Sequence, residues 1–211
     1  MARDSSLVFW RNGQAGERIE FPSRIRSLAT NEDHSLLFAG CESGCVYTVQ
    51  VGTGKFTELT KVNGARVQTL HYQSGKLLAG CSNGILRVVT LAENRISREF
   101  NLGNSVDFVR INQKQDMLLV GCNNRLIYAF QWSNLSLQPL HLEDVNPAAH
   151  TGILQDDGSL YLSCQDNSLR KRSMSSDWLQ SHVSEQIRQE VKKEEFKKLL
   201  KSKDIPSLQM E

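Results

Sequence analysis

The chain has 211 residues, 39% of them hydrophobic and 23% charged, and its formal net charge is +2 at pH 7. This length and composition suit one globular core with a small appendage, and the near-neutral charge argues against a surface that binds nucleic acid or membranes. No apolar run approaches the roughly 20 residues that cross a bilayer, and the N-terminal MARDSSLVFW lacks the apolar core of a secretion signal. We therefore expect a cytoplasmic or nuclear protein with reduced thiols.

Short strands separated by turn residues are predicted from the N-terminus onward. The first two lie at 6–10 and 16–20, within SLVFWRNGQAGERIE. The next segment has turns rich in Asn, Asp and Gly, which favour the dihedral angles of tight turns. Its four strands are expected near 24–30, 35–40, 45–51 and 55–60.

Four of the five cysteines recur at a nearly constant interval. Cys41, Cys81, Cys122 and Cys164 are 40, 41 and 42 residues apart, and each follows a short apolar run and precedes a polar turn. A repeat of about 40 residues that holds four strands is typical of a β-propeller, in which each repeat forms one blade. The predicted propeller domain spans 1–173, with a partial blade at 1–20 and further blades at 21–62, 63–100, 101–142 and 143–173.

These repeats resemble the WD-repeat family over about residues 5–173. The segments LLFAGCESG, LLAGCSNG and MLLVGCNN match the family's second strand and turn, and VGTGKF supplies its TG turn. The family's Gly-His and Trp-Asp pairs are absent: Trp10 stands at the Trp position, and later repeats have Val49, Val89 and Phe130 there. The resemblance implies a propeller fold and says little about function.

Both ends of the predicted propeller are incomplete. The N-terminal segment matches the third and fourth strands of a blade, and the last repeat carries Arg172 in its third strand, SLRKRS. Three interpretations remain open: a four-blade ring in which 6–10 and 16–20 pair beside 151–155 and 159–164, an open arc that pairs with another chain, or a truncated or spliced product. We favour the incomplete arc, whose exposed strand edges and apolar faces promote association.

The composition changes after Ser173. Residues 174–211 are rich in Glu, Lys and Gln, and they are predicted to form a helical extension. Its apolar stripe would contact the propeller or a partner through Val183, Ile187, Val191, Phe196 and Leu200. The expected fold class is therefore all-β, with about four propeller-type blades in a complete or incomplete ring, followed by a C-terminal α-helix.

The sequence contains no recognised catalytic motif. The repeat cysteines are interpreted as small buried residues at the contacts between blades, and one cysteine per blade would hold the sulfurs too far apart for zinc. We predict no metal site, no cofactor and no enzymatic activity. An enzyme on a propeller scaffold is a disfavoured alternative, because Asp107 is the only acid on a predicted first strand.

The favoured function is a non-enzymatic scaffold or adaptor subunit that binds other proteins, among them a second propeller half or a subunit that contacts the helix. By the family's architecture, first strands line the central channel, and Arg24 and Arg66 precede them at aligned positions. Arg26, Tyr72 and Trp132 are further candidates, because Arg and aromatic residues dominate binding hot spots. The alternatives are that these arginines only promote solubility, and that the chain is a partial propeller without an activity of its own.

Overall fold

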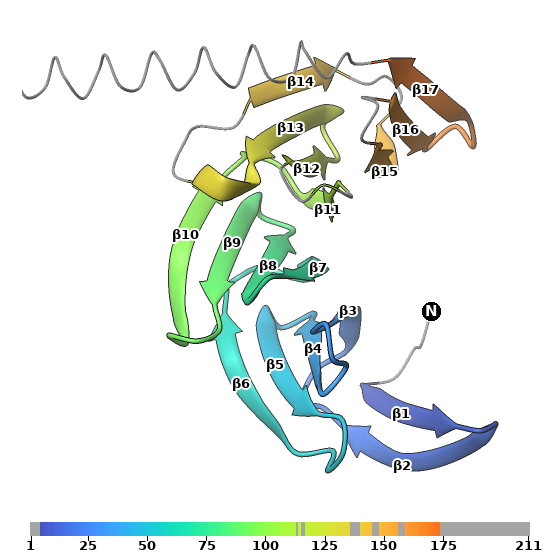
Figure 1. Cartoon of the computed structure of the whole chain (residues 1–211), viewed down its shortest axis with the longest axis vertical. Helices are drawn as coiled ribbons and strands as arrows, with labels where there is room; N and C mark the ends of the chain where they lie inside the picture. Colours follow the sequence, from blue (N-terminus) through green and yellow to red (C-terminus); the bar gives the residue numbers. More distant parts are fainter. Residues whose placement is uncertain are drawn as a thin grey trace, which may run out of the picture.

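The computed structural model describes residues 5–112, 114, 117–135, 140–144, 148–155 and 159–173. These residues form five antiparallel sheets, A to E in chain order, which follow one another along an open arc (Figure 1). Within each sheet the strand order follows the sequence. The first strands of sheets B to E lie on the concave side of the arc, and the last strands lie on its outer side (Figure 1).

Three sheets have four strands, and the two terminal sheets have fewer. Sheet A consists of β1 (Ser6–Arg11) and β2 (Gln14–Glu20). Sheet B consists of β3 (Ile25–Thr30), β4 (Leu36–Cys41), β5 (Cys45–Gln50) and β6 (Phe56–Lys61). Sheet C consists of β7 (Val67–Gln73), β8 (Lys76–Cys81), β9 (Ile85–Thr90) and β10 (Arg95–Asn101). Sheet D consists of β11 (Val106–Ile111), β12 (Met117–Cys122), β13 (Leu126–Gln131) and β14 (Leu140–Asp144), and sheet E of β15 (Ala149–Leu154), β16 (Ser159–Cys164) and β17 (Leu169–Ser173).

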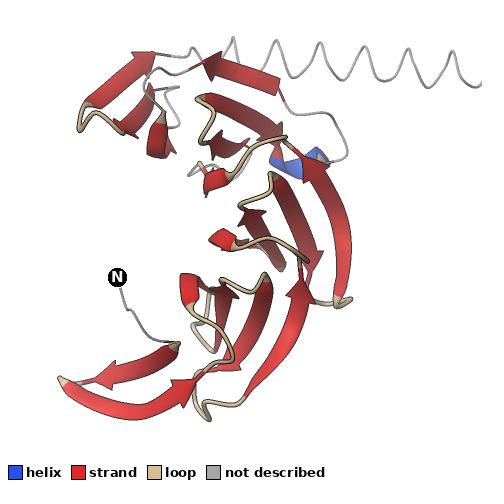
Figure 2. Ribbon diagram, turned by 180° about the vertical axis from the view of Figure 1, so that it is seen from behind, coloured by secondary structure: helices blue, strands red, loops and turns tan. Residues whose placement is uncertain are grey.

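The predicted fold class is wrong in one respect. The described residues contain no α-helix, and their one helical element is a 3-10 turn, η1 (Trp132–Asn134), drawn in blue in Figure 2. The extension at 174–211, with its predicted stripe, lies outside the described residues. Apolar residues at helical spacing stabilise a helix only marginally without packing, so that pattern did not justify a helix in the fold class. The described fold is all-β.

The repeat cysteine has the same place in every sheet that contains one. The first residue of each first strand pairs with that cysteine, and a β-bulge follows; the pairs are Ile25 with Cys41, Val67 with Cys81, Val106 with Cys122 and Ala149 with Cys164. The residue after each cysteine donates its backbone N–H to the carbonyl oxygen that precedes the first strand, as from Glu42 to Arg24 at 2.8 Å and from Ser82 to Arg66 at 2.9 Å. The alignment of the repeats on the cysteines is therefore also a structural alignment.

The hydrophobic core lies between the sheets. Four clusters of buried side chains each join two consecutive sheets. Between sheets B and C, for example, Phe38 of β4 stacks on Tyr72 of β7, with ring centroids 5.5 Å apart. The first strands carry the chain of contacts, since β3 contacts β7, β7 contacts β11 and β11 contacts β15.

A glycine before the repeat cysteine lets the second strand of one sheet approach the first strand of the next. A Cβ atom at Gly40 would lie 2.5 Å from Val67 Cγ1 of the next sheet, and one at Gly80 would lie 2.5 Å from Val106 Cγ1. Real Cβ atoms do not approach so closely, so these two positions require glycine. The corresponding residue of sheet E is Ser163, which is exposed, because no described sheet follows it.

The arc is open between its two ends. Sheet A consists of β1 and β2 alone, and sheet E of β15 to β17, so the predicted pairing that would close a four-blade ring does not form. Trp10 is 70% exposed, whereas the aligned Val49, Val89 and Phe130 are at most 2% exposed. Leu169 of β17 is 76% exposed, whereas its counterparts Val46 and Leu86 are fully buried. The end sheets therefore expose side chains that internal sheets bury.

We expect Gly80→Ala to lower the free energy of unfolding by about 1–3 kcal/mol, the usual cost of overpacking a filled core. The methyl group would strike Thr69 of the adjacent strand β7 and Val106 of β11 in the next sheet. Gly52→Ala is the matched control, because nothing lies within 4 Å of a Cβ atom there. Urea unfolding followed by circular dichroism measures both; equal stability of the two variants would show that the sheets can separate to admit the methyl group.

Candidate functional site

Two of the predicted arginines, Arg26 and Arg66, meet at the contact between sheets B and C. Arg26 of β3 donates from Nε to Gln68 Oε1 of β7 at 3.0 Å, and its Nη1 lies 3.4 Å from Glu42 Oε1. Arg66, which precedes β7, places Nη1 3.8 Å from the same carboxylate oxygen. Glu42 thus lies between arginines of two sheets. We call Arg24, Arg26, Glu42, Arg66 and Gln68 the inner rim.

Arg24 differs from Arg66 in its surroundings. Both residues precede a first strand, and both accept a backbone hydrogen bond from the residue after the repeat cysteine. Arg66 reaches the carboxylate of Glu42 on the preceding sheet. Sheet A has no strand or turn in the place from which Glu42 extends, and the Arg24 side chain has no ion pair within the part of the chain that the structure describes. Arg24 is thus a half-buried cation without a described counter-ion.

The structure does not bring the two predicted aromatic residues into the inner rim. Tyr72 packs between sheets B and C against Phe38, and its hydroxyl oxygen accepts a hydrogen bond from the backbone N–H of Gly75 at 3.1 Å. Trp132 is buried in the cluster between sheets C and D, and Lys76 Nζ lies 5.2 Å from its ring centroid. In the described fold both side chains join sheets. The helix residues proposed for partner contact lie outside the described residues.

Two residues of the inner rim were not predicted from the sequence. Glu42 follows the repeat cysteine and begins the polar turn that the sequence predicts there. Its position is that of Ser82 in the next repeat, so no repeated acid marked it. Gln68 aligns with Arg26, two residues after the aligned arginines. An acid in the turn beside two aligned arginines was the available clue, but only the contact between adjacent sheets shows that these groups meet.

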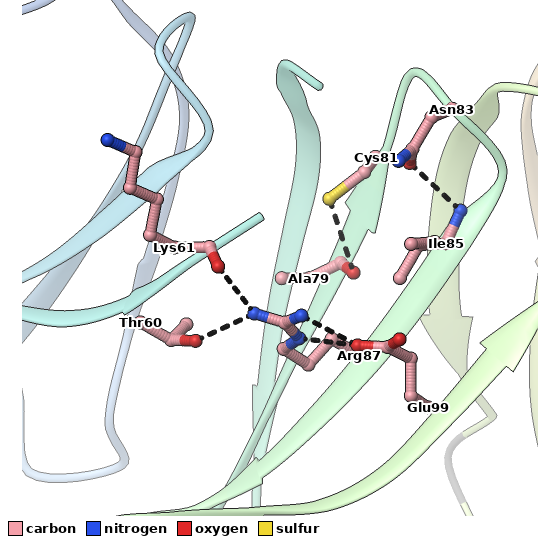
Figure 3. A network of polar contacts seen from close by, with 8 residues as sticks. All are labelled: Thr60, Lys61, Ala79, Cys81, Asn83, Ile85, Arg87 and Glu99. Carbon is pink, nitrogen blue, oxygen red and sulfur yellow. Dashed lines mark hydrogen bonds and ion pairs between the residues drawn. The ribbon is translucent and has the colours of Figure 1, made fainter. Parts of the chain in front are cut away.

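A second polar cluster joins the outer strands (Figure 3). Arg87 of β9 donates from Nη1 to Thr60 Oγ1 at 3.0 Å and to the Lys61 carbonyl oxygen at 2.8 Å, both on β6 of the preceding sheet. Its Nε and Nη2 donate to Glu99 Oε2 of β10 at 2.8 and 2.7 Å. The Arg87 side chain is 11% exposed. This network ties sheet B to sheet C, which identifies Arg87 as a structural residue.

The cysteines are all free and buried, as the sequence predicts for the repeat cysteines. Burial raises the pKa of Cys41, with a smaller contribution from Cys45, and it raises the pKa of Cys81; both thiols reach about 11. Burial, assisted by the charge of Asp107, raises the pKa of Cys122 to about 12. Such thiols stay protonated and unreactive at neutral pH. Among the described residues, no group of three or more His, Cys, Asp or Glu side chains is arranged to hold a metal ion.

Two half-buried titratable groups lie on the first strands. Burial lowers the pKa of His71, and the positive charge of Arg110 lowers it further. Burial raises the pKa of Asp107, although Ser105 Oγ donates a hydrogen bond to Asp107 Oδ1 at 3.2 Å. A pocket of about 390 Å³ lies elsewhere, between the turns that follow β1 and β5. It contains neither of these two groups, so the described residues present no assembled set of catalytic side chains around it.

Comparisons with known proteins support the fold. No protein-family model and no curated protein matches the sequence. Among solved structures, the computationally designed Ika4 protein is similar with a TM-score of 0.58 and 14% identity, over 74% of this chain and 94% of that one. A chain in the structure of the Mitotic Checkpoint Complex is similar with a TM-score of 0.68 and 16% identity, over 81% of this chain and 55% of that one. The chain thus spans about half the length of the second protein.

Such low identities show the fold alone. The structural similarity and the successive four-stranded antiparallel sheets together identify a β-propeller-like fold. This confirms the fold that the WD-repeat resemblance implies, without assigning the chain to that family. The described residues contain no helix that is long and apolar enough to cross a membrane.

We expect Arg87→Ala to lower the free energy of unfolding by about 1–3 kcal/mol, because the Thr60 hydroxyl and the Lys61 carbonyl of the preceding sheet would lose a charged donor. The ion pair with Glu99 adds less, since that carboxylate is 41% exposed. Arg95→Ala is the matched control and should leave the stability unchanged, because Arg95, at the start of β10, pairs with Glu93 of the preceding turn and both side chains are at least 50% exposed. Urea titration of both variants decides whether the network stabilises the fold.

We expect stability to fall as the pH rises above about 9. The unfolded thiols ionise near pH 9, whereas the folded thiols of Cys41, Cys81 and Cys122 keep their protons until pH 11–12. Ionisation therefore favours the unfolded chain, by up to about 1.4 kcal/mol per pH unit for each thiol. Urea unfolding between pH 8 and 11 measures the slope. Cys122→Ala should reduce it, and an unchanged slope would assign the effect to other groups.

Proposed function

We propose that the protein is a non-enzymatic scaffold for protein–protein interactions and acts as a subunit of a larger assembly in the cytoplasm or nucleus. The observation that carries this proposal is the exposure of large apolar side chains at both ends of the arc. Trp10 is 70% exposed at one end, and Leu169 is 76% exposed at the other. Large exposed apolar side chains at sites that are buried elsewhere in the same fold are typical of contact surfaces.

The inner rim supports the same proposal. Arg26 of β3 and Arg66, which precedes β7, lie on adjacent sheets and share the carboxylate of Glu42, and Arg is enriched in binding hot spots. Arg66 is half exposed, so its guanidinium can bind a partner's carboxylate as well as Glu42. The complex whose chain resembles this fold is itself an assembly of proteins. A partial propeller without an activity of its own is the alternative.

The test is capture of partners from cytosolic and nuclear extracts with the immobilised full chain, followed by mass spectrometry and by reconstitution with the purified partner. We expect a stoichiometric partner that binds Trp10→Ser or Leu169→Ser at least tenfold more weakly, because each substitution removes a large apolar contact. Ile96→Ser is the matched control: Ile96 is 47% exposed on an internal sheet, and its loss should leave binding unchanged.

The opposite results are equally clear. If no stoichiometric partner binds and the chain stays monomeric, the scaffold proposal fails, and the partial propeller without independent activity becomes the favoured interpretation. If the partner binds Ile96→Ser as weakly as the two end variants, the contact surface is not at the ends of the arc.

A further inference from the structure

Sheet A lacks the strands that carry the inner half of every other sheet. Its two strands pack on sheet B through Leu7, Phe9 and Ile19, as a third and a fourth strand would. One edge of β1 pairs with β2, and in the described sheets its other edge pairs with no strand. A strand edge of this kind offers a row of backbone donors and acceptors to another chain.

The missing strands leave an apolar side chain of β3 uncovered. Leu28 is 48% exposed, whereas Leu70 at the equivalent position of β7 is 5% exposed and Val109 of β11 is fully buried. Leu70 shares a cluster with Phe38, which extends from the second strand of the preceding sheet. Sheet A has no second strand to cover Leu28 in this way. The greater exposure of Leu28 is therefore explained by the strands that sheet A lacks.

The charge of Arg24 marks the same place. The contact between sheets B and C pairs Arg66 with Glu42, the residue that follows the second strand of sheet B. By the repeat, Arg24 faces the corresponding place beside β1, where the described sheets have no strand. Leu28 and Arg24 thus lie beside the open edge of β1. At the contact between sheets B and C, the equivalent Leu70 and Arg66 find their partners within the chain.

We propose that the free edge of β1, together with Leu28 and Arg24, binds a β-hairpin of a partner protein, which supplies the two inner strands of sheet A. This proposal deepens the scaffold function and rests on it. The hairpin would pair with β1 through main-chain hydrogen bonds, and its side chains would provide specificity. By analogy with Phe38, Gly40 and Glu42, its second strand carries a large apolar residue against Leu28, then a glycine, then an acid that reaches Arg24.

The partner is a different protein rather than a second copy. The chain contains a hairpin in the required role, β15 with β16, but β17 pairs with the outer edge of β16 from Ser159 to Ser163. That edge is the one that β1 would need. A second copy would therefore have to lose β17 before it could bind, whereas a separate hairpin binds without that loss.

The chain's own β3–β4 hairpin provides a probe. We would use a fluorescein-labelled synthetic peptide of residues 24–43 with Cys41→Ser, titrate it with the full chain and follow fluorescence anisotropy. Leu28→Ser in the full chain should weaken binding at least tenfold, since it removes the apolar contact. Arg24→Glu should weaken binding about threefold, and Glu42→Lys in the peptide should restore it, because the charges are then exchanged. Ile96→Ser and Arg95→Glu are the controls and should leave binding unchanged.

The outcomes separate this proposal from the scaffold function. Binding that is unaffected by Leu28→Ser, or absent altogether, overturns the hairpin site. A dimer in native mass spectrometry that Leu28→Ser dissociates would make the occupant a second copy and also overturn it. If a captured partner binds the Leu28→Ser and Arg24→Glu variants normally but not the Leu169→Ser variant, the scaffold function stands and the hairpin site fails.

Discussion

The close contact between the second strand of one sheet and the first strand of the next is the constraint on which the structure depends. Gly40 and Gly80 leave no room for a side chain, and Val67 and Val106 of the following sheets occupy that space. The repeat cysteine beside each glycine pairs with the start of the first strand, so the register of the sheet and the contact to its neighbour are set at one point. Sheets in such an arrangement stabilise one another mainly through nearest neighbours.

The same constraint explains why the two ends matter. An internal sheet buries apolar residues on both faces, whereas an end sheet has a neighbour among the described sheets on one face only. In sheet E, Ser163 occupies the position that glycine has in sheets B to D, and Lys171 Nζ lies 5.3 Å from the Tyr161 ring centroid. The face of sheet E that no described sheet covers is therefore partly polar. Leu28, Trp10 and Leu169 have no such cover. The ends thus carry both the risk of aggregation and the capacity to bind a partner.

Local patterns predicted much of the fold. The turn residues around 31–33, 42–44 and 52–54 bounded the four strands of sheet B, which lie within about one residue of their expected places. The cysteine spacing correctly indicated a repeated position. The predicted fold class was wrong in including an α-helix, since the described residues contain none. Periodicity in the sequence does not show whether a helix has a surface to pack against. Neither the pairing of Arg26 and Arg66 with Glu42 nor the burial of Trp132 could be predicted, since both depend on which sheets are neighbours.

The sequence by itself determined the repeat, the strands within each repeat and the small residue before each cysteine, because turn chemistry and alternation act over a few residues. Only the tertiary structure decided that the ends do not pair, that Glu42 lies between two arginines, and that Leu28 is exposed while Leu70 is buried. Leu28 and Leu70 have the same aligned position and the same side chain. They differ only in whether the second strand of a neighbouring sheet packs against them, and that is a property of the assembled sheets.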